Sequence, residues 1–233
     1  MYAFSDLHGN YNLWKQIKQF LTNNKAYAIC LGDVVDRGPE GWKIFKEVID
    51  SPYVITFLLG NHELMMYEAL AKDNKLDLNL WFYNGGEPTY KAAINDPLKD
   101  KYLEKFAKTF EYYVIYENWF ISHAGITIPK DKKLSFNSEM KDCLIWDRNH
   151  IYNSSTKEGM NILHGHTPVQ YLGNRFDRLG ISYSFNSEKG VLTYCNEQKY
   201  CIDLCTIETQ AATLFNLETK KGMVFTDESA ETI

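Results

Sequence analysis

The chain has 233 residues, of which 45% are hydrophobic and 24% charged, which is typical of one globular domain with a substantial core. Its 30 acidic and 25 basic residues give a net charge of −5, so no overall positive charge favours nucleic acid or an anionic membrane. No apolar run approaches the roughly 20 residues that span a bilayer, and no export signal follows Met1. We therefore expect a cytoplasmic protein with reduced cysteines and without membrane or nucleic-acid partners.

Three strand-like runs alternate with helical patterns in the first third of the chain. Strands are expected at residues 2–4, 26–31 and 54–59, with helical patterns at 13–21, after Pro39, and at 64–70. Parallel strands in this β-α-β-α-β order place their carboxyl ends at one edge of a sheet, where open α/β sheets bind ligands. The third run is continuously apolar, which predicts a strand buried on both faces.

The rest of the chain predicts a helical segment followed by a second sheet. Residues 76–109 have a helical pattern interrupted by glycine and proline, and we expect them to form a small cap. Short strands are then expected at residues 113–116, 119–122, 161–163, 181–185, 191–195 and 200–204, with two more before the end. One domain is expected over residues 1–226, with a frayed acidic tail at 227–233.

Motifs rich in metal-ligand residue types follow several of the strand-like runs. They lie at residues 5–10, 32–38, 60–63, 122–125 and 164–168, and they contain five of the six histidines. Asp6, Asp33 and Asn61 are 27 and 28 residues apart, about one β-α unit each. Carboxylate, imidazole and amide ligands suit Mn, Fe or Zn, and the absence of cysteine argues against a structural thiolate zinc site. Any one of these histidines taken alone could equally be a structural residue, but their occurrence together in these motifs predicts a metal site.

These motifs resemble the signature of the PPP-type phosphoprotein phosphatase family, a branch of the calcineurin-like metallophosphoesterases. The resemblance is carried by Ser5-Asp6-Leu7-His8-Gly9, residues 32–38, Gly60-Asn61-His62-Glu63, His123 and Gly165-His166-Thr167. It is strongest with the compact bacterial and phage serine/threonine protein phosphatases. The resemblance implies an α/β fold, a four-layer sandwich of two mixed β-sheets flanked by helices, with the small helical cap.

The same resemblance implies two divalent metal ions per chain. One would be held by Asp6, His8 and Asp33, and the second by Asp33, Asn61, His123 and His166. Mn²⁺ is the expected metal, with Fe, Zn and Ni as alternatives. Two cations about 3.5 to 4 Å apart can share a water and lower its pKa, and the resulting hydroxide would attack phosphorus in line.

The remaining implied roles concern proton transfer and substrate binding. His62 would donate a proton to the leaving oxygen, while Asp36 would bind the other ring nitrogen and orient the imidazole. Arg37 and Arg148 would bind phosphate oxygens through the planar guanidinium fork, and Asn61 would also contact the substrate. A surface salt bridge is the alternative interpretation for Arg148.

Other residues near the motifs receive separate interpretations. Leu59 stands where many family members have arginine, which weakens the case for a phosphorylated protein as substrate. Ala124 replaces a glycine and should be tolerated if its φ is negative. Glu63 is interpreted as structural in the first turn of a helix. His164 is interpreted as the end of a buried strand rather than a group supporting the metals, and His150 has no assigned role.

These roles indicate a metal-dependent phosphomonoesterase, and the leading hypothesis is a serine/threonine protein phosphatase acting on phosphorylated proteins. Symmetrical hydrolysis of dinucleoside polyphosphates is the alternative enzyme function, because that branch of the family shares the same motifs. A non-catalytic scaffold of the same fold is the alternative of another class. His62, Asp36 and Arg37 argue against the scaffold, since metal binding alone would not require them.

Overall fold

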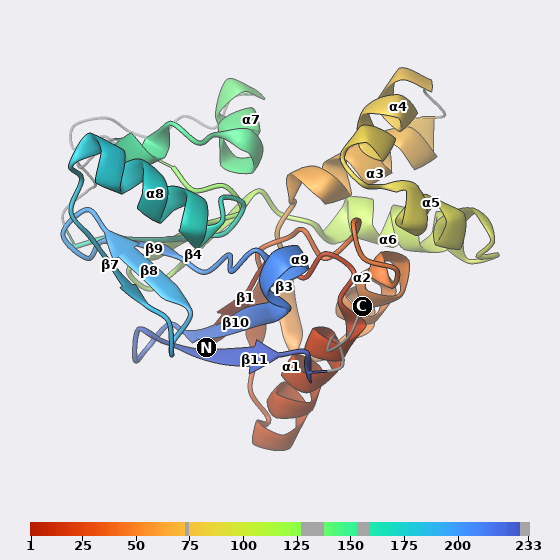
Figure 1. Ribbon diagram of the computed structural model, residues 1–233. Coiled ribbons are helices and arrows are strands. Elements are labelled where there is room, and N and C mark those ends of the chain that lie inside the picture. The colour runs from red at the N-terminus through yellow and green to blue at the C-terminus, as the bar shows by residue number, and fades with distance from the viewer. Residues whose placement is uncertain (73–74, 127–137, 153–158, 229–233) are drawn as a thin grey trace.

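The computed structural model describes residues 1–72, 75–126, 138–152 and 159–228. No helix in these ranges is long and apolar enough to cross a membrane. Two β-sheets form the centre of the molecule, and helices cover them from outside (Figure 1). This arrangement of two mixed sheets flanked by helices confirms the predicted fold class.

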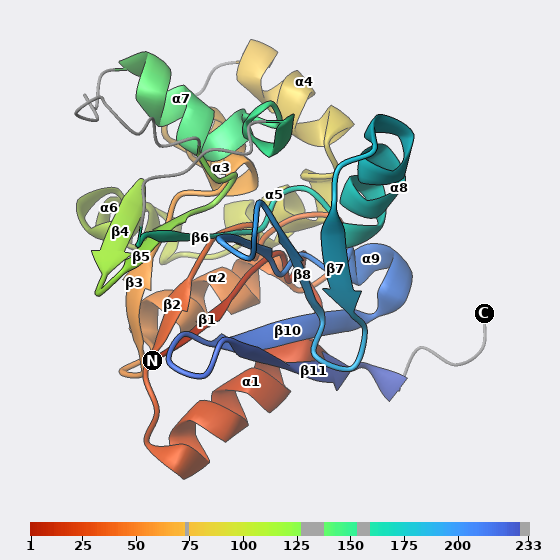
Figure 2. The ribbon, with the colours of Figure 1, turned by 90° about the vertical axis from the view of Figure 1, so that its left-hand side faces the viewer.

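The first sheet has the strand order β11-β10-β1-β2-β3. Its strands are β1 (Tyr2–Phe4), β2 (Ala28–Cys30), β3 (Val54–Phe57), β10 (Ala211–Asn216) and β11 (Lys221–Thr226). The first three are parallel, and they alternate with α1 (Tyr11–Asn24), α2 (Gly41–Asp50) and α3 (Asn61–Lys72), as predicted. Strand β10 pairs with β1 in the antiparallel direction, and α1 lies beneath β10 and β11 (Figure 2).

Strand β3 is an edge strand, which contradicts the prediction of burial on both faces. Only Phe57 of its four residues is fully buried, and Ile55 is 53% exposed. The apolar run continues into Leu58 and Leu59, which are buried after the strand has ended. The continuous pattern therefore combined a half-exposed strand with a buried loop.

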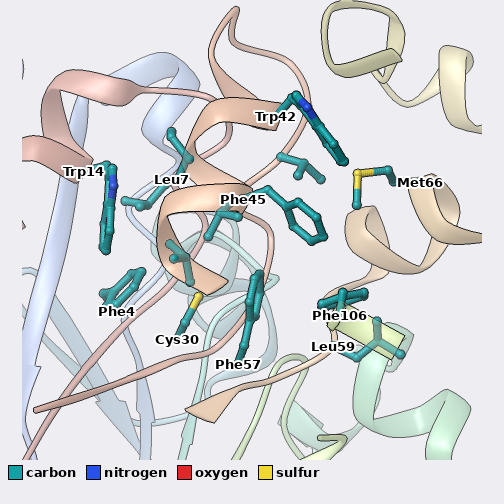
Figure 3. Packing of buried hydrophobic residues seen from close by; sticks show 14 of the residues in the cluster. Phe4, Leu7, Trp14, Cys30, Trp42, Phe45, Phe57, Leu59, Met66 and Phe106 are labelled. Atoms are coloured by element: carbon teal, nitrogen blue, oxygen red, sulfur yellow. The ribbon is translucent and has the colours of Figure 1, made fainter. Parts of the chain in front are cut away.

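The segment expected to form a cap contains α4 (Lys75–Tyr83), α5 (Glu87–Ile94) and α6 (Lys99–Thr109). Helix α6 joins the core on the outer face of the first sheet. The Phe106 ring lies 5.1 Å from Phe45 of α2 and 5.3 Å from Phe57 of β3, measured between ring centroids (Figure 3). This aromatic packing fixes α6, while the turn between α4 and α5 extends toward the motif loops.

The second sheet has the strand order β4-β5-β6-β9-β8-β7. Its strands are β4 (Tyr113–Tyr116), β5 (Trp119–Ser122), β6 (Asn161–His164), β7 (Tyr183–Asn186), β8 (Val191–Tyr194) and β9 (Lys199–Cys201). The segments beside it include α7 (Ser138–Trp146), a 3-10 helix (His150–Tyr152), α8 (Val169–Leu179) and α9 (Thr206–Thr209). Helix α8 packs Leu172 and Phe176 against the outer face of this sheet.

The two sheets pack face to face through one buried apolar cluster. Ala3 and Ile29 from the first sheet meet Trp119, Ile121 and Leu163 from the second. Because β1, β2, β5 and β6 contribute to the same cluster, the loops that follow these strands are brought together. The predicted acidic tail starts at Asp227, whose N–H donates to the carbonyl of Gln210 at 2.8 Å, and its residues 229–233 lie outside the described part.

Candidate metal centre and active site

The loops after β1 and β2 interlock through their backbones. The N–H of His8 donates to the carbonyl of Asp33 at 3.0 Å, so the two motifs are held in register. Gly9 and Gly38 touch backbone to backbone, and a Cβ at Gly9 would lie 2.5 Å from the carbonyl oxygen of Gly38. These glycines are therefore required by close approach of the two loops.

Six of the predicted site residues have a left-handed backbone, with φ between 41° and 70°. They are Asp6, His8, Asp33, Asp36, Arg37 and His166. Each such residue costs about 1 to 3 kcal/mol unless it is glycine, and the conformation persists only where the surrounding structure holds it. Because these residues are concentrated in the loops after the strands, we infer that a strained backbone holds their side chains in the directions the site needs.

Asp33 lies at the centre of the predicted ligands. Its Oδ2 is 3.3 Å from His123 Nε2 and 3.9 Å from His8 Nε2. Asn61 Oδ1 is 3.1 Å from His123 Nε2 and 2.9 Å from His166 Nδ1. All five side chains are buried. Residues that follow five different strands thus converge on one point.

Two groups of potential ligand atoms share Asp33, and the atoms within each group lie within 4.8 Å of one another. One group is His8, Asp33 and His62, and the other is Asp33, His123 and His166. A carboxylate shared between two groups suits a bridged pair of divalent cations. Asp6 belongs to neither group, and its carboxylate accepts hydrogen bonds from the Ser5 hydroxyl and from the N–H of His166.

Two observations indicate that this donor set fits cations. His166 Nε2 is buried and has no hydrogen-bond partner among the described residues. The positively charged Arg37 guanidinium donates to His8 Nε2 at 2.9 Å and to His62 Nε2 at 3.0 Å. The imidazole lone pairs therefore already face a positive group, and oxygen and nitrogen donors of this kind bind Mn, Fe or Zn.

Burial and mutual charge shift the titration of the site. Burial raises the pKa of Asp6 to about 6 and lowers the pKa values of His8 and His166 well below their ordinary range. Burial alone would also lower the pKa of His123, but the charge and hydrogen bond of Asp33, together with the charges of Asp6 and Glu63, outweigh it and raise that pKa to about 9. One protonated imidazole therefore pairs with the central carboxylate, while the others keep free lone pairs.

His62 is oriented by a buried hydrogen-bond chain. Its Nδ1 lies 2.8 Å from Asp36 Oδ2, and Trp81 Nε1 donates to the same oxygen at 2.7 Å. The N–H of Asp36 donates to Thr89 Oγ1 at 2.9 Å. Burial raises the pKa of Asp36, and these donors oppose that shift. Trp81 and Thr89 belong to α4 and α5, so the expected cap segment supports the predicted proton donor.

Glu63 holds the backbone of the Asp33 loop through hydrogen bonds. Its carboxylate is fully buried and accepts hydrogen bonds from the N–H groups of Asp33 at 2.7 Å and Val34 at 2.8 Å. Burial raises the pKa of Glu63 to about 7. These contacts are with backbone only, which agrees with the structural interpretation of this residue.

His164, His150 and Ala124 lie behind the ligands. His164 is the last residue of β6, and its Nε2 is 2.9 Å from the hydroxyl of Tyr194. The His150 ring packs 4.8 Å from the His164 ring, measured between centroids. His164 is thus the end of a buried strand, as interpreted from the sequence. Ala124 is not among the residues with positive φ, so the expected tolerance holds there.

A cleft of about 490 Å³, here called the metal cleft, opens above the convergent side chains. Its lining includes Asp33, Asn61, His62, Asn84, Trp146 and both predicted phosphate ligands, Arg37 and Arg148. A second cleft of about 330 Å³, here called the α8 cleft, shares Arg37, Arg148 and His166 with the first. Its other lining residues include Tyr171, Arg175, Asp203 and Glu208.

The sequence interpretation missed the α8 cleft. Val169, Leu172 and Phe176 are apolar at helical spacing, and this signal could have identified α8. Asp203 lies beyond β9, in a segment that was predicted to be strand, and it is buried beside the shared arginines. The presence of the charged Asp203 within an otherwise apolar run could have indicated this wall of the cleft from the sequence.

Comparisons with known proteins agree with this geometry. The sequence model of the calcineurin-like phosphoesterase family matches residues 1–199. A symmetrical bis(5'-nucleosyl)-tetraphosphatase of Buchnera aphidicola (subsp. Schizaphis graminum) is 33% identical over 79 residues, covering 32% of this chain and 29% of the relative. The enzyme of the same name from Wigglesworthia glossinidia brevipalpis is 29% identical over 156 residues, covering 64% and 53%. The matches thus span about half or less of these curated relatives.

Solved structures share the fold at low sequence identity. A metallophosphoesterase from Sphaerobacter thermophilus has a TM-score of 0.57 at 15% identity, covering 100% of this chain and 90% of its own. A structure provisionally described as a diadenosine tetraphosphatase has a TM-score of 0.63 at 11% identity, covering 96% and 91%. A serine/threonine phosphatase from Saccharomyces cerevisiae gives 0.50 at 11% identity, covering 100% and 80%. At such low identities, the similarity to these structures shows only that the fold is shared.

Proposed function

The chain belongs to the calcineurin-like phosphoesterase family, and we propose that it is a metal-dependent hydrolase that cleaves dinucleoside polyphosphates symmetrically. The observation that carries the hydrolase assignment is the sharing of Asp33 by two groups of ligand atoms beneath one arginine-lined cleft. The names of the curated relatives support the nucleotide substrate. They favour the alternative predicted from the sequence over its leading hypothesis, a serine/threonine protein phosphatase.

The proposed ligands are those implied by the sequence motifs. One cation would be held by Asp6, His8 and Asp33, and the other by Asp33, Asn61, His123 and His166. The observed groups share His8 and Asp33 with the first set and Asp33, His123 and His166 with the second, and the first observed group has His62 in place of Asp6. Bound there, two divalent cations would draw charge from the phosphoryl oxygens and lower the pKa of an attacking water. Oxygen and nitrogen ligands accept several metals, and Mn²⁺ remains the proposed one.

The chain's own residues would then orient the substrate and move a proton. Arg37 and Arg148 line the metal cleft and would bind the non-bridging oxygens of the attacked phosphate, with Asn61 beside them. His62 Nε2, which accepts from Arg37 in the free site, would carry a proton once Arg37 binds the phosphate and would donate it to the leaving oxygen, while Asp36 holds Nδ1 and stabilises the imidazolium. In line geometry requires the attacking water and this donor to lie on opposite sides of the phosphorus.

Leaving-group chemistry distinguishes the two substrate classes. A serine alkoxide is strongly basic and needs a proton when the bond to phosphorus breaks, so His62 would be essential for a phosphoprotein. A nucleoside diphosphate leaves through a phosphate oxygen whose last pKa is about 6, so it depends less on a proton donor. Leu59 adds no positive charge beside the site where many relatives have arginine, which also disfavours a phosphorylated protein.

The test compares substrates on protein that has been stripped of metal and reloaded with Mn²⁺. Turnover is measured on diadenosine tetraphosphate, a phosphoserine peptide and p-nitrophenyl phosphate, with Asp33→Asn as the inactive control. We expect a preference for the dinucleotide and ADP as its sole nucleotide product. A strong preference for the peptide would restore the protein-phosphatase hypothesis, and inactivity on every ester with two metals bound would favour the scaffold.

A further inference from the structure

The two clefts meet at the proposed phosphate-binding residues. The metal cleft and the α8 cleft have Arg37, Arg148 and His166 in common, so a molecule bound at these arginines can extend in two directions. One direction runs over Asn84 and Trp146, and the other runs along α8. A phosphate held between the arginines therefore has room for a substituent on each side.

The α8 cleft carries unpaired positive charge. Arg37, Arg148 and Arg175 line it, and none of the three forms an ion pair with a carboxylate in the described part of the chain. The Arg175 guanidinium lies 4.5 Å from the Tyr152 ring centroid, which holds it in place by a cation–π contact. Asp203 and Glu208 also line this cleft, so three arginines face two carboxylates.

An exposed aromatic side chain stands beside this charge. Tyr171 lies on α8 four residues before Arg175, so the two side chains share one face of the helix. Both residues line the cleft, and Tyr171 is 67% exposed, so most of its ring is free to be covered by a ligand. An aromatic ring beside an arginine is the combination that binds a base by stacking and its phosphates by charge.

Symmetrical cleavage requires a site with two arms. Water adds to one of the two central phosphorus atoms, the central P–O–P bond breaks, and two nucleoside diphosphates leave. The scissile bond therefore carries a nucleotide on each side, whereas a phosphomonoester carries an organic group on one side only. A single cleft suffices for a monoester, and two clefts meeting at the arginines suit the dinucleotide.

We infer that the α8 cleft binds one nucleotide arm of the substrate, with Arg175 at its phosphates and Tyr171 stacked on its base. This inference rests on the proposed function, because it names the place of the second arm in the same reaction. The cleft determines specificity, since Arg175 and Tyr171 lie beyond the two proposed metal positions and would touch the arm rather than the reacting phosphorus.

The experiment measures kcat/KM of the Mn²⁺-loaded enzyme on diadenosine tetraphosphate and on p-nitrophenyl phosphate, and compares the ratio between variants. Arg175→Ala should lower the ratio about 10- to 100-fold, which is the loss of a charge-assisted hydrogen bond, chiefly through KM for the dinucleotide. Tyr171→Ala should lower this ratio by a similar factor, because the stacking contact with the base is lost. Arg178→Ala is the matched control, because Arg178 is exposed on the same helix and does not line the cleft.

Binding of ADP, measured by calorimetry, separates the two levels of the proposal. If wild-type protein fails to hydrolyse the dinucleotide, the proposed function falls, and ADP affinity then tests the cleft alone. If the dinucleotide is hydrolysed but Arg175→Ala and Arg178→Ala give the same ratio and the same ADP affinity as wild type, the assignment of the α8 cleft is overturned. A loss on the phosphoserine peptide that exceeds the loss on the dinucleotide would overturn it as well.

Discussion

Substitution of Trp81 by phenylalanine tests whether helix α4 takes part in proton transfer through its contact with Asp36. The indole N–H of Trp81 donates to Asp36 Oδ2 at 2.7 Å, and the same oxygen binds the ring of His62. Phenylalanine keeps an aromatic ring in this fully buried position but removes the donor. In this variant Asp36 Oδ2 keeps only the contact with His62, and Asp36 Oδ1 has no partner among the described residues. The lost hydrogen bond is therefore not compensated.

The magnitude follows from the burial of both groups. A hydrogen bond to a charged group contributes roughly 1.5 to 3 kcal/mol, and every 1.36 kcal/mol changes a rate about tenfold. The Asp36 carboxylate loses this support, its raised pKa rises further, and the protonated form of His62 is stabilised less. We expect kcat on phenyl phosphate to fall about 10-fold, with a smaller loss on p-nitrophenyl phosphate, whose leaving group is less basic.

The chain supplies a matched control in Trp42. Its indole N–H donates to the Asp96 carboxylate at 2.8 Å, and the side chain is also buried and lines neither cleft. Both variants should lose thermal stability, but only Trp81→Phe should change the pH dependence of kcat. Equal kinetic effects in the two variants, or an unchanged pH profile for Trp81→Phe, would refute this reasoning.

Three further predictions address the donor, the ligands and stability. His62→Asn should keep both metals by elemental analysis and lower turnover of alkyl phosphates roughly 10²- to 10⁴-fold, with a smaller loss on the dinucleotide. Because the pKa of His123 is raised to about 9, Mn²⁺ affinity should rise from pH 7 to 9 and binding should release protons, measured by calorimetry in two buffers. The hydrogen bond from Lys46 lowers the pKa of Asp96 to about 2. This contribution is present above pH 4 and lost as the pH falls through 2, so Asp96→Asn should cost about 1 to 2 kcal/mol at pH 7 and nothing near pH 2 in urea unfolding.

The convergence of the predicted ligand residues could be expected from the sequence because they follow strands directly. β1, β4 and β5 have the predicted bounds, and Asp6, Asn61 and His123 follow their strands within a few residues. Parallel pairing within the first sheet brings Asp6 and Asn61 to one edge, and the packing of the two sheets brings His123 beside them. The burial of β3 could not be predicted in this way, because a continuous apolar run does not show where an edge strand ends and a buried loop begins.

Contacts between distant segments could not be read from the sequence. Trp81 lies in the segment that was predicted to form a cap, and its donor function depends on a partner 45 residues away. The shared position of Arg148 and Arg175 at the α8 cleft likewise depends on how α8 packs onto the second sheet. Periodicity predicts which face of a helix is buried, but it does not predict what its exposed face will meet.

Residues 84–89, at the junction of α4 and α5 and in the first turn of α5, also hold the backbone of the proposed catalytic residues. The N–H of Arg37 donates to the carbonyl of Gly85 at 2.8 Å, and the N–H of Asp36 donates to Thr89. Both Asp36 and Arg37 have positive φ, a conformation that lasts only where other contacts hold it. Since this segment also contributes Asn84 to the metal cleft, a change there would alter substrate binding and proton transfer together. Tyr171 and Arg175 of the α8 cleft take part in neither hydrogen bond, so they are the part of the site where specificity can change while the proton donor stays in place.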